Sequence, residues 1–212
     1  MRFSLNRNQY VANKLGILNG TTILDIGCRD MVLKTYLKGN FNYKGLDFQI
    51  TEKLTENKDL INHNLESRLP KDLGKYDIIN ALDVLEHLEN IHDVFQDLFN
   101  HSNNQIIIAL PNIGYYRFRL SFLFNGILSK KYTFNKNKTD DRHRWIPNYY
   151  TIQEFVNHNI NKKWIVKKKN FIFERKRNFI FFYIEKILSY FFPNLFVYEI
   201  IFFFKKKNEQ NF

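Results

Sequence analysis

A glycine turn and an acidic residue about 20 positions later are spaced for binding a nucleoside. A buried apolar run ends at Gly27, which has no Cβ and therefore lets a ligand approach the backbone closely. Asp47 ends the next apolar run, where a carboxylate can accept hydrogen bonds from both hydroxyls of a ribose. Arg29 and Met31 stand where a dinucleotide fingerprint has glycines. We therefore predict a nucleoside ligand without a pyrophosphate group.

Two histidines are candidates for a general base, because an imidazole can accept a proton near neutral pH. They are His87 and His143. Each has a plainer interpretation: His87 can begin the loop after a strand, and His143 can lie among solvated charges. The six histidines and one cysteine show no metal-ligand spacing, and residues 86–92 lack an i, i+4 histidine pair. The sequence therefore predicts no metal site.

The elements that must position these residues are short apolar strands that alternate with helical stretches. This alternation predicts a mainly parallel sheet with right-handed crossovers, whose strands end at one shared edge. Strands are predicted over residues 22–26, 43–47, 59–64, 76–82, 105–110, 164–173 and 198–204. Helices are predicted over residues 7–17 and 32–38, and a helical turn or two within 49–58. Two further helices are predicted to begin after the cap Asn90 and at Thr151.

Several motifs resemble those of one enzyme family. LDIGCRDM at residues 24–31 resembles the first motif of the class I S-adenosylmethionine-dependent methyltransferases, which reads roughly LDIGCGDG. The likeness continues through Asp47, NLE at 64–66 and DVLEHL at 83–88, and LPNIGYYR at 110–117 looks like the MetW-type members. The resemblance implies an α/β, Rossmann-like three-layer sandwich. Its seven-stranded sheet would be mostly parallel, with the last strand antiparallel.

The same resemblance implies S-adenosylmethionine as the cofactor. Asp47 would hold the ribose, and Asn64 would lie near the adenine unless its amide serves only as a turn former. Asp25 would order the glycine turn and face the methionine end. Arg29 would either pair with the cofactor's carboxylate or close the pocket with its bulk. The expected cofactor-binding residues are Asp25, Gly27, Arg29, Asp47, Phe48, Asn64, Leu65, Asp83 and His87.

An insertion at about residues 114–150 is the candidate cap over the acceptor, because loops beyond the carboxyl ends of the strands hold substrates in α/β enzymes. Its aromatic and basic residues would contact a small-molecule, sugar or lipid-linked acceptor more plausibly than a nucleic acid. The expected acceptor contacts are Tyr115, Arg117, His143, Arg144 and Trp145.

Two functions therefore remain open. The first is methyl transfer from S-adenosylmethionine to such an acceptor, favoured by Asp47. The second is a degenerate methyltransferase fold that acts as a binding or regulatory subunit, as MetW-type proteins are thought to assist a homoserine acyltransferase. Arg29 and Met31 favour this second function.

Length and composition bound the remaining alternatives. The 212 residues suit one domain, 1–212, and the 44% hydrophobic fraction excludes general disorder. The net charge of +11 is consistent with a nucleic-acid or anionic-membrane partner, but biased composition explains it better, and no RNA-binding signature is present. One cysteine, Cys28, and no secretory signal favour a cytoplasmic protein. Packing under the turn explains Cys28 as well as reactivity does.

The apolar segment 179–192, between the last two predicted strands, is expected to be a helix. The basic residues Lys167–Lys169 and Arg175–Arg177 flank it. An interfacial helix with such flanks can lie on an anionic membrane and hold the protein near a lipid-linked acceptor. We favour the commoner alternative, a core helix that covers one sheet edge.

Overall fold

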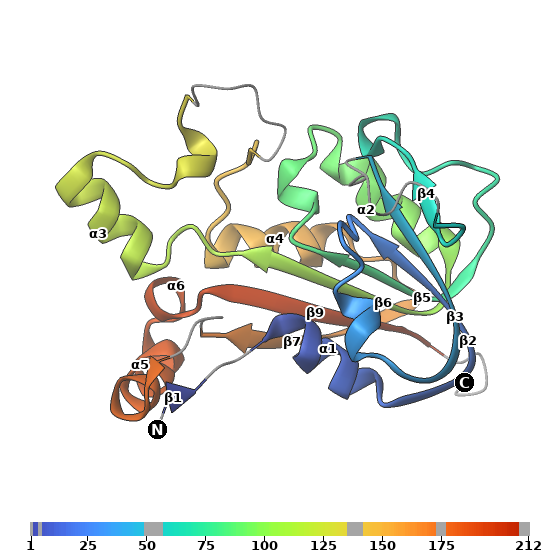
Figure 1. Cartoon of the computed structure of the whole chain (residues 1–212). Helices are drawn as coiled ribbons and strands as arrows, with labels where there is room; N and C mark the ends of the chain where they lie inside the picture. The colour runs from blue at the N-terminus through green and yellow to red at the C-terminus, as the bar shows by residue number, and fades with distance from the viewer. Residues whose placement is uncertain (1, 4–5, 49–56, 135–141, 173–176, 208–212) are drawn as a thin grey trace.

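A seven-stranded sheet organises the chain (Figure 1). The computed structural model describes residues 2–3, 6–48, 57–134, 142–172 and 177–207. The strand order is β4-β3-β2-β5-β6-β9-β7. The strands are β2 (Ile17–Ile26), β3 (Lys38–Asp47), β4 (Leu60–Asn62), β5 (Tyr76–Leu82), β6 (Ser102–Pro111), β7 (Trp164–Phe171) and β9 (Glu199–Lys206).

Strand directions confirm the predicted sheet. Strands β4, β3, β2, β5 and β6 pair in parallel, whereas β9 lies antiparallel between β6 and β7. Parallel strands that are covered on both faces read as continuous apolar runs, which is why the central strands could be recognised in the sequence. The carboxyl ends of β2, β3 and β5 consequently meet at one edge.

Helices cover both faces of this sheet. On one face, α1 (Arg7–Leu15) and the short 3₁₀ turn η1 (Leu33–Tyr36) pack on a cluster that includes Ile23 and Ile107. On the other face, α2 (Ile91–His101) and α4 (Tyr149–Asn159) pack on a cluster that includes Leu24 and Ile108. Neighbouring residues of one strand point to opposite faces, so the structure has the three predicted layers.

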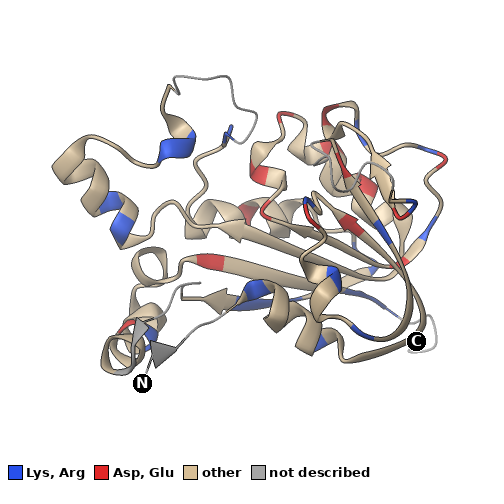
Figure 2. Cartoon of the chain, viewed as in Figure 1, with Lys and Arg blue, Asp and Glu red and all other residues tan. Residues whose placement is uncertain are grey.

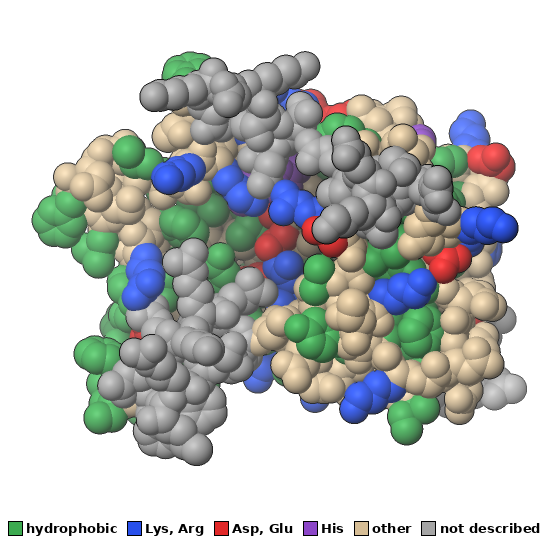
Figure 3. Space-filling view, in the orientation of Figure 1, with side chains coloured by type: hydrophobic (Ala, Val, Ile, Leu, Met, Phe, Trp, Pro, Cys, Tyr) green, Lys and Arg blue, Asp and Glu red, His purple; other side chains and the backbone are tan. Residues whose placement is uncertain are grey.

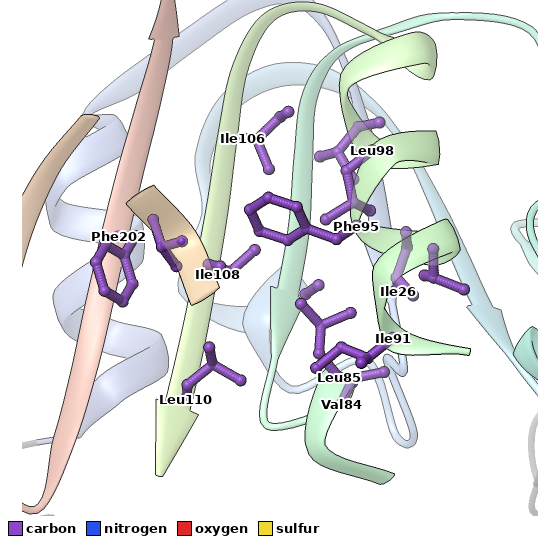
Figure 4. Packing of buried hydrophobic residues seen from close by; sticks show 14 of the residues in the cluster. Ile26, Val84, Leu85, Ile91, Phe95, Leu98, Ile106, Ile108, Leu110 and Phe202 are labelled. Carbon is purple, nitrogen blue, oxygen red and sulfur yellow. The ribbon is translucent and has the colours of Figure 1, made fainter. Parts of the chain in front are cut away.

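The larger core cluster is centred on α2. Phe95 projects from α2 toward the sheet beside Ile106 and Ile108 (Figure 4) and is fully buried. Its ring makes edge contacts with the rings of Phe99, Phe155 and Phe204, with centroids 5.0–5.9 Å apart. Asn90 precedes the helix as predicted, but its side chain donates to backbone carbonyls of residues 65 and 66 and makes no capping hydrogen bond.

The first crossover is shorter than predicted. A helix was expected over 32–38, but only η1 forms, because β3 begins already at Lys38 and pairs with the start of β2. Gly39 allows this pairing: a Cβ there would lie 2.1 Å from the Leu18 carbonyl oxygen. The helical turn expected within 49–58 lies mostly outside the described residues.

The insertion at 114–150 contains a helix, α3 (Tyr116–Asn125), and a 3₁₀ turn, η5 (Lys130–Tyr132). Residues 135–141 of the insertion are outside the described part of the chain. Figure 1 shows α3 projecting from one end of the sheet, and none of its residues is buried.

The apolar segment forms α5 (Phe179–Phe191), as predicted, followed by α6 (Pro193–Phe196). A two-stranded ribbon of β1 (Arg2–Phe3) and β8 (Arg177–Asn178) precedes α5. The favoured core position was wrong, since most of the apolar side chains of α5 whose burial is described are exposed. No helix within the described ranges is long and apolar enough to cross a bilayer.

The aromatic cluster predicts a large stability effect. Phe95→Ala should lower the free energy of unfolding by about 3–5 kcal/mol, because it removes a fully buried ring and leaves a cavity. Phe122→Ala, on the exposed part of α3, is the matched control and should change it by less than about 0.5 kcal/mol. Chemical denaturation of both variants measures the difference, and equal losses would contradict this description of the core.

Candidate active site

The glycine turn lies where the central strands end. Gly27 follows β2 with φ of +66° and donates its backbone N–H to the Leu46 carbonyl at 2.7 Å. A Cβ at this position would lie 2.1 Å from Cγ2 of Val84, in the loop after β5. The turn therefore requires glycine both for its left-handed conformation and for its contact with the next loop.

Asp47 points toward this turn. Its Oδ2 accepts the backbone N–H of Arg29 at 2.9 Å, and the residue is 8% exposed. Arg29 and Met31 both have positive φ, +43° and +54°. These are the two positions where the resembled motif has glycine, so the loop keeps a glycine-like path at a cost of roughly 1–2 kcal/mol for each residue.

The Arg29 side chain does not fill the space beside the turn. It is exposed and lines the cavities on both sides of Gly27. Met31 is buried below the loop, near Gly45. Of the two alternatives for Arg29, the structure rules out closure of the pocket by its bulk.

Two adjoining cavities open at this edge of the sheet. They measure about 230 and 190 Å³ and share Gly27, Arg29, Asp83 and His87. The first is lined in addition by Asp47, Phe48, Asn64, Leu65, Glu66, Val84, Leu88, Arg142 and Arg144. The second is lined in addition by Arg7, Asn8, Asp25, Ile26, Cys28, Val32, Leu33, Leu82 and Lys131.

The second cavity carries both signs of charge. Arg7 of α1 pairs with Asp83 and, at 2.8 Å, with Glu199 at the start of β9. Lys131 adds a second cation to the lining. Asp25 accepts a hydrogen bond from the Tyr43 hydroxyl, and its burial raises the pKa of the carboxyl group to about 7. This cavity therefore suits a zwitterionic group such as an amino acid.

Cys28 is 7% exposed and packs between the turn and β3. Burial, followed by the neighbouring carboxylates Asp25 and Asp47, raises the pKa of its thiol to about 12. A protonated, buried thiol is a poor nucleophile, so the structure favours the packing role.

Residues 142–145 are attached to the loop after β5. The backbone N–H groups of Arg144 and Trp145 donate to the Glu86 carbonyl at 3.0 and 3.4 Å. The Trp145 indole donates to the Leu88 carbonyl at 2.7 Å, and the Arg144 guanidinium lies 3.0 Å from Glu66. The described end of the insertion thus forms one wall of the first cavity.

This attachment brings three potential ligand groups together. Oε1 of Glu86 lies 3.8 Å from Nε2 of His87 and 3.8 Å from Nε2 of His143. The two imidazole centroids are 4.5 Å apart. Glu86 is 1% exposed, and its burial, together with the negative charge of Asp83, raises the pKa of its carboxyl group.

A protein-family model named "Methyltransferase domain" matches residues 6–157, more than half of the chain. The chain belongs to this methyltransferase family. No curated protein matches the chain in sequence. The family prediction is therefore confirmed, whereas the narrower resemblance to MetW-type proteins stays a prediction.

Several methyltransferases of known structure have the same fold as this chain. The small RNA methyltransferase HEN1 is 13% identical with a TM-score of 0.64; the match covers 99% of this chain but only 27% of that protein's chain. The plantazolicin methyltransferase BpumL in complex with SAH is 14% identical, with a TM-score of 0.56 and coverage of 95% and 82%. The magnesium protoporphyrin IX methyltransferase ChlM from Synechocystis PCC 6803, with bound SAH, is 17% identical, with a TM-score of 0.51 and coverage of 94% and 83%.

All nine expected cofactor-binding residues of the methyltransferase line the two cavities. The second cavity is lined by Asp25, and the first by Asp47, Phe48, Asn64 and Leu65. The other four, Gly27, Arg29, Asp83 and His87, line both. Asn64 also has the turn-forming role, because its Oδ1 accepts the Glu66 N–H at 3.0 Å. Their contacts with a cofactor remain predictions.

Fewer of the residues expected to contact the acceptor line a cavity. Arg144 lines the first cavity and Trp145 a third one, whereas Tyr115 is 2% exposed and packs against Tyr116 and Tyr198. Arg117 is exposed on α3 and donates to the Tyr116 hydroxyl. The structure thus gives Tyr115 a packing role instead of an acceptor contact.

His143 is also nearly buried and lines none of the three cavities described, so it does not face an acceptor directly. Sequence reasoning missed Arg7, Lys131, Arg142 and Glu86. Glu86 lies within the DVLEHL motif, and that motif was the available signal for it.

The pKa of Asp25 predicts a pH-dependent stability. Its pKa is raised in the fold, so the folded protein binds more protons than the unfolded chain between about pH 4 and 7, and stability falls as pH rises through this window. Asp25→Asn should therefore raise the free energy of unfolding at pH 8, by on the order of 1–3 kcal/mol, and change it little at pH 4.

Denaturation at both pH values tests this, with the exposed Asp72→Asn as a control that should show no such pH-dependent gain. Asp25→Asn could instead lower the free energy of unfolding by the same amount at both pH values. That result would show that burial of the Asp25 charge does not dominate its effect on stability.

Proposed function

We propose that the chain transfers a methyl group from S-adenosylmethionine to a small-molecule, sugar or lipid-linked acceptor. The observation that carries this proposal is the pair of cavities that meet at Gly27, one beside the Asp47 carboxylate and one with both signs of charge. Their chemistry matches the two halves of that cofactor. Support also comes from the SAH bound in similar structures, since SAH is the product that S-adenosylmethionine leaves.

The nucleoside half fits the first cavity. Asp47, which already holds the Arg29 N–H of the turn, would accept the ribose hydroxyls. Phe48 and Leu65 offer apolar surface for the adenine, and Asn64 lies at the same cavity.

The amino-acid half fits the second cavity. Its ammonium group would face Asp25 and Asp83, and its carboxylate would face the cations Arg7, Arg29 and Lys131. The reactive sulfonium methyl group would then lie where the two cavities adjoin. The protein's main task in an in-line displacement is to align the acceptor with this methyl group.

A binding or regulatory subunit, as in the MetW resemblance, is the second candidate. The non-glycine residues Arg29 and Met31 favour it, because they strain the cofactor loop. The open cavities and the orientation of Asp47 favour the enzyme. Cofactor binding together with turnover on an acceptor separates the two functions.

Gly27→Ala should abolish S-adenosylmethionine binding, because the new methyl group would displace the Val84 loop that lines the first cavity. Asp47→Asn should weaken binding about tenfold or more by removing the charged ribose acceptor. Isothermal titration calorimetry measures both effects.

Gly74→Ala is the matched control. Gly74 also has positive φ, +81°, but a Cβ there meets nothing within 4 Å, so this variant has the backbone strain without the site collision. Its affinity should equal that of the wild type. Wild-type protein that gives no binding heat at millimolar cofactor would overturn the enzyme proposal and leave the binding subunit.

We also infer that the chain docks on an anionic membrane surface through α3 and α5. These helices lie at the same end of the molecule (Figure 1), and the Tyr116 hydroxyl of α3 donates to Glu185 of α5 at 2.6 Å. Their exposed apolar residues gather at this end (Figure 3) and are Leu120, Phe122, Leu123, Phe124 and Ile127 near α3, with Ile180, Phe181, Tyr183, Ile184, Ile187, Tyr190, Phe191 and Phe192 near α5.

Charge complementarity supports a lipid occupant for this surface. Arg117, Arg119, Lys130 and Lys186 lie along these helices and the turn after α3 (Figure 2), whereas Glu185 is buried and hydrogen-bonded. An apolar surface bordered by cations suits a headgroup layer of anionic phospholipids. Such docking would place the cavities near a lipid-linked acceptor.

Flotation with vesicles tests the membrane surface. Wild-type protein should float with vesicles that contain phosphatidylglycerol and much less with vesicles of phosphatidylcholine alone. The double variant Leu123→Asp, Tyr190→Asp should bind at least fivefold less, which corresponds to a loss of roughly 1 kcal/mol or more in binding free energy. Ile17→Asp is the control, because Ile17 is equally exposed but begins β2, at the opposite end of the strands. Wild-type protein that stays unbound would refute membrane docking.

A further inference from the structure

One cluster of side chains is explained neither by the proposed cofactor site nor by packing of the core. It consists of Glu86, His87 and His143. Glu86 and His87 are consecutive in the loop after β5, whereas His143 lies 56 positions after His87 and meets them because residues 142–145 attach to that loop. Their potential ligand atoms all lie within 4.8 Å of one another.

The carboxylate of Glu86 lacks the hydrogen bonds that a buried charge needs. Both of its oxygens are buried, and neither accepts a hydrogen bond from any residue that the structure describes. Burial of a carboxylate without hydrogen bonds or a cation is costly. A positive charge between Glu86 and the imidazoles would offset this cost.

Both imidazoles are oriented as metal-binding histidines are. Nδ1 of His87 lies 2.9 Å from the Arg142 carbonyl oxygen, so it must carry the proton that it donates. Nδ1 of His143 lies 2.9 Å from the Tyr132 hydroxyl, whose single proton is donated to the Trp145 carbonyl at 2.7 Å. His143 therefore also donates from Nδ1. In their neutral forms, both rings then direct an Nε2 lone pair toward Glu86.

We propose that Glu86, His87 and His143 bind a divalent first-row transition-metal ion. Two imidazoles and one carboxylate suit Mn²⁺, Fe²⁺, Co²⁺ or Zn²⁺ better than Mg²⁺ or Ca²⁺, which prefer oxygen ligands. Ligand atoms about 2.1 Å from a tetrahedral ion are about 3.4 Å apart, so the observed 3.8 Å separations need only a small contraction.

The position of the ion indicates the class of acceptor. Three protein ligands leave at least one coordination position open, and His87 lines both cavities at their junction. An acceptor hydroxyl can occupy this position, where the metal lowers its pKa. This part of the inference rests on the proposed methyl transfer, and it replaces the general-base role predicted for the two histidines.

The reaction balances without another reactant. The hydroxyl proton leaves to solvent, and the acceptor oxygen forms a bond to the methyl carbon as the sulfur–carbon bond breaks. The electron pair of that bond stays on sulfur, which changes from a sulfonium to a neutral thioether. With a hydroxyl acceptor at the proposed ion, the methylated atom would be this oxygen.

Metal binding can be measured without cofactor or acceptor. Protein dialysed against chelator should bind one Co²⁺ and, in calorimetry, one Zn²⁺ per chain. Glu86→Gln and His143→Ala should each weaken binding at least tenfold, and Co²⁺ visible absorption should report mixed nitrogen and oxygen ligation. His158→Ala, on the exposed surface of α4, is the control and should bind as the wild type does.

A positioning variant covers the chance that a ligand variant fails to fold. Tyr132→Phe leaves all three ligands in place but removes the oxygen that orients His143, and should weaken binding about tenfold. Wild-type protein that binds no metal, or variants that all bind it equally, would overturn the metal site.

Cofactor titration separates this inference from the proposed function. Metal-free protein should still bind S-adenosylmethionine, whereas methylation of a hydroxyl acceptor should require the ion. Cofactor binding without metal binding would overturn only the metal site, and metal binding without cofactor binding would overturn only the methyl transfer. Full turnover in chelator would overturn the metal's role toward the acceptor.

Discussion

The close approach of the Gly27 backbone to Val84 is the constraint on which the site depends. A Cβ at Gly27 would overlap the Val84 side chain, so the turn after β2 and the loop after β5 contact each other directly. This contact holds together the loops that follow two neighbouring strands, β2 and β5. Asp47 then joins the third strand to the same turn through the Arg29 N–H. Both cavities are lined by Gly27 and Asp83, so they adjoin at this contact.

The fold supports several unfavourable features at this edge. Arg29, Met31 and Asp83 all have positive φ, and Glu86 is buried without a hydrogen-bond partner within the described chain. Strained or uncompensated groups of this kind collect at functional sites, where the surrounding structure holds them in place. Here the two apolar clusters, on opposite faces of the sheet, provide the stability that offsets them. The methyltransferase family assignment agrees with a functional site at this edge of the sheet.

The difference between the buried sheet and the surface elements explains which predictions were accurate. Gly27 and Asp47 could be located because each follows a continuous apolar strand, whose residues are buried on both faces and leave a clear pattern. The helix expected over residues 32–38 formed only the short 3₁₀ turn η1, because β3 already begins at Lys38 and little chain is left between the glycine turn and this strand. The position of α5 was also wrong, since hydrophobicity alone does not say whether a helix meets the core or an external apolar phase.

Sequence by itself determined the strands along the chain, the family, and nine of the residues that line the two cavities, because local periodicity and short motifs carry that information. Only the tertiary structure decided which distant side chains meet. His143 is 56 positions from His87 in the printed sequence, and no spacing rule connects them. They face Glu86 together because backbone hydrogen bonds attach residues 144 and 145 to the loop after β5. Contacts of this kind depend on how loops close in space, which local sequence patterns do not encode.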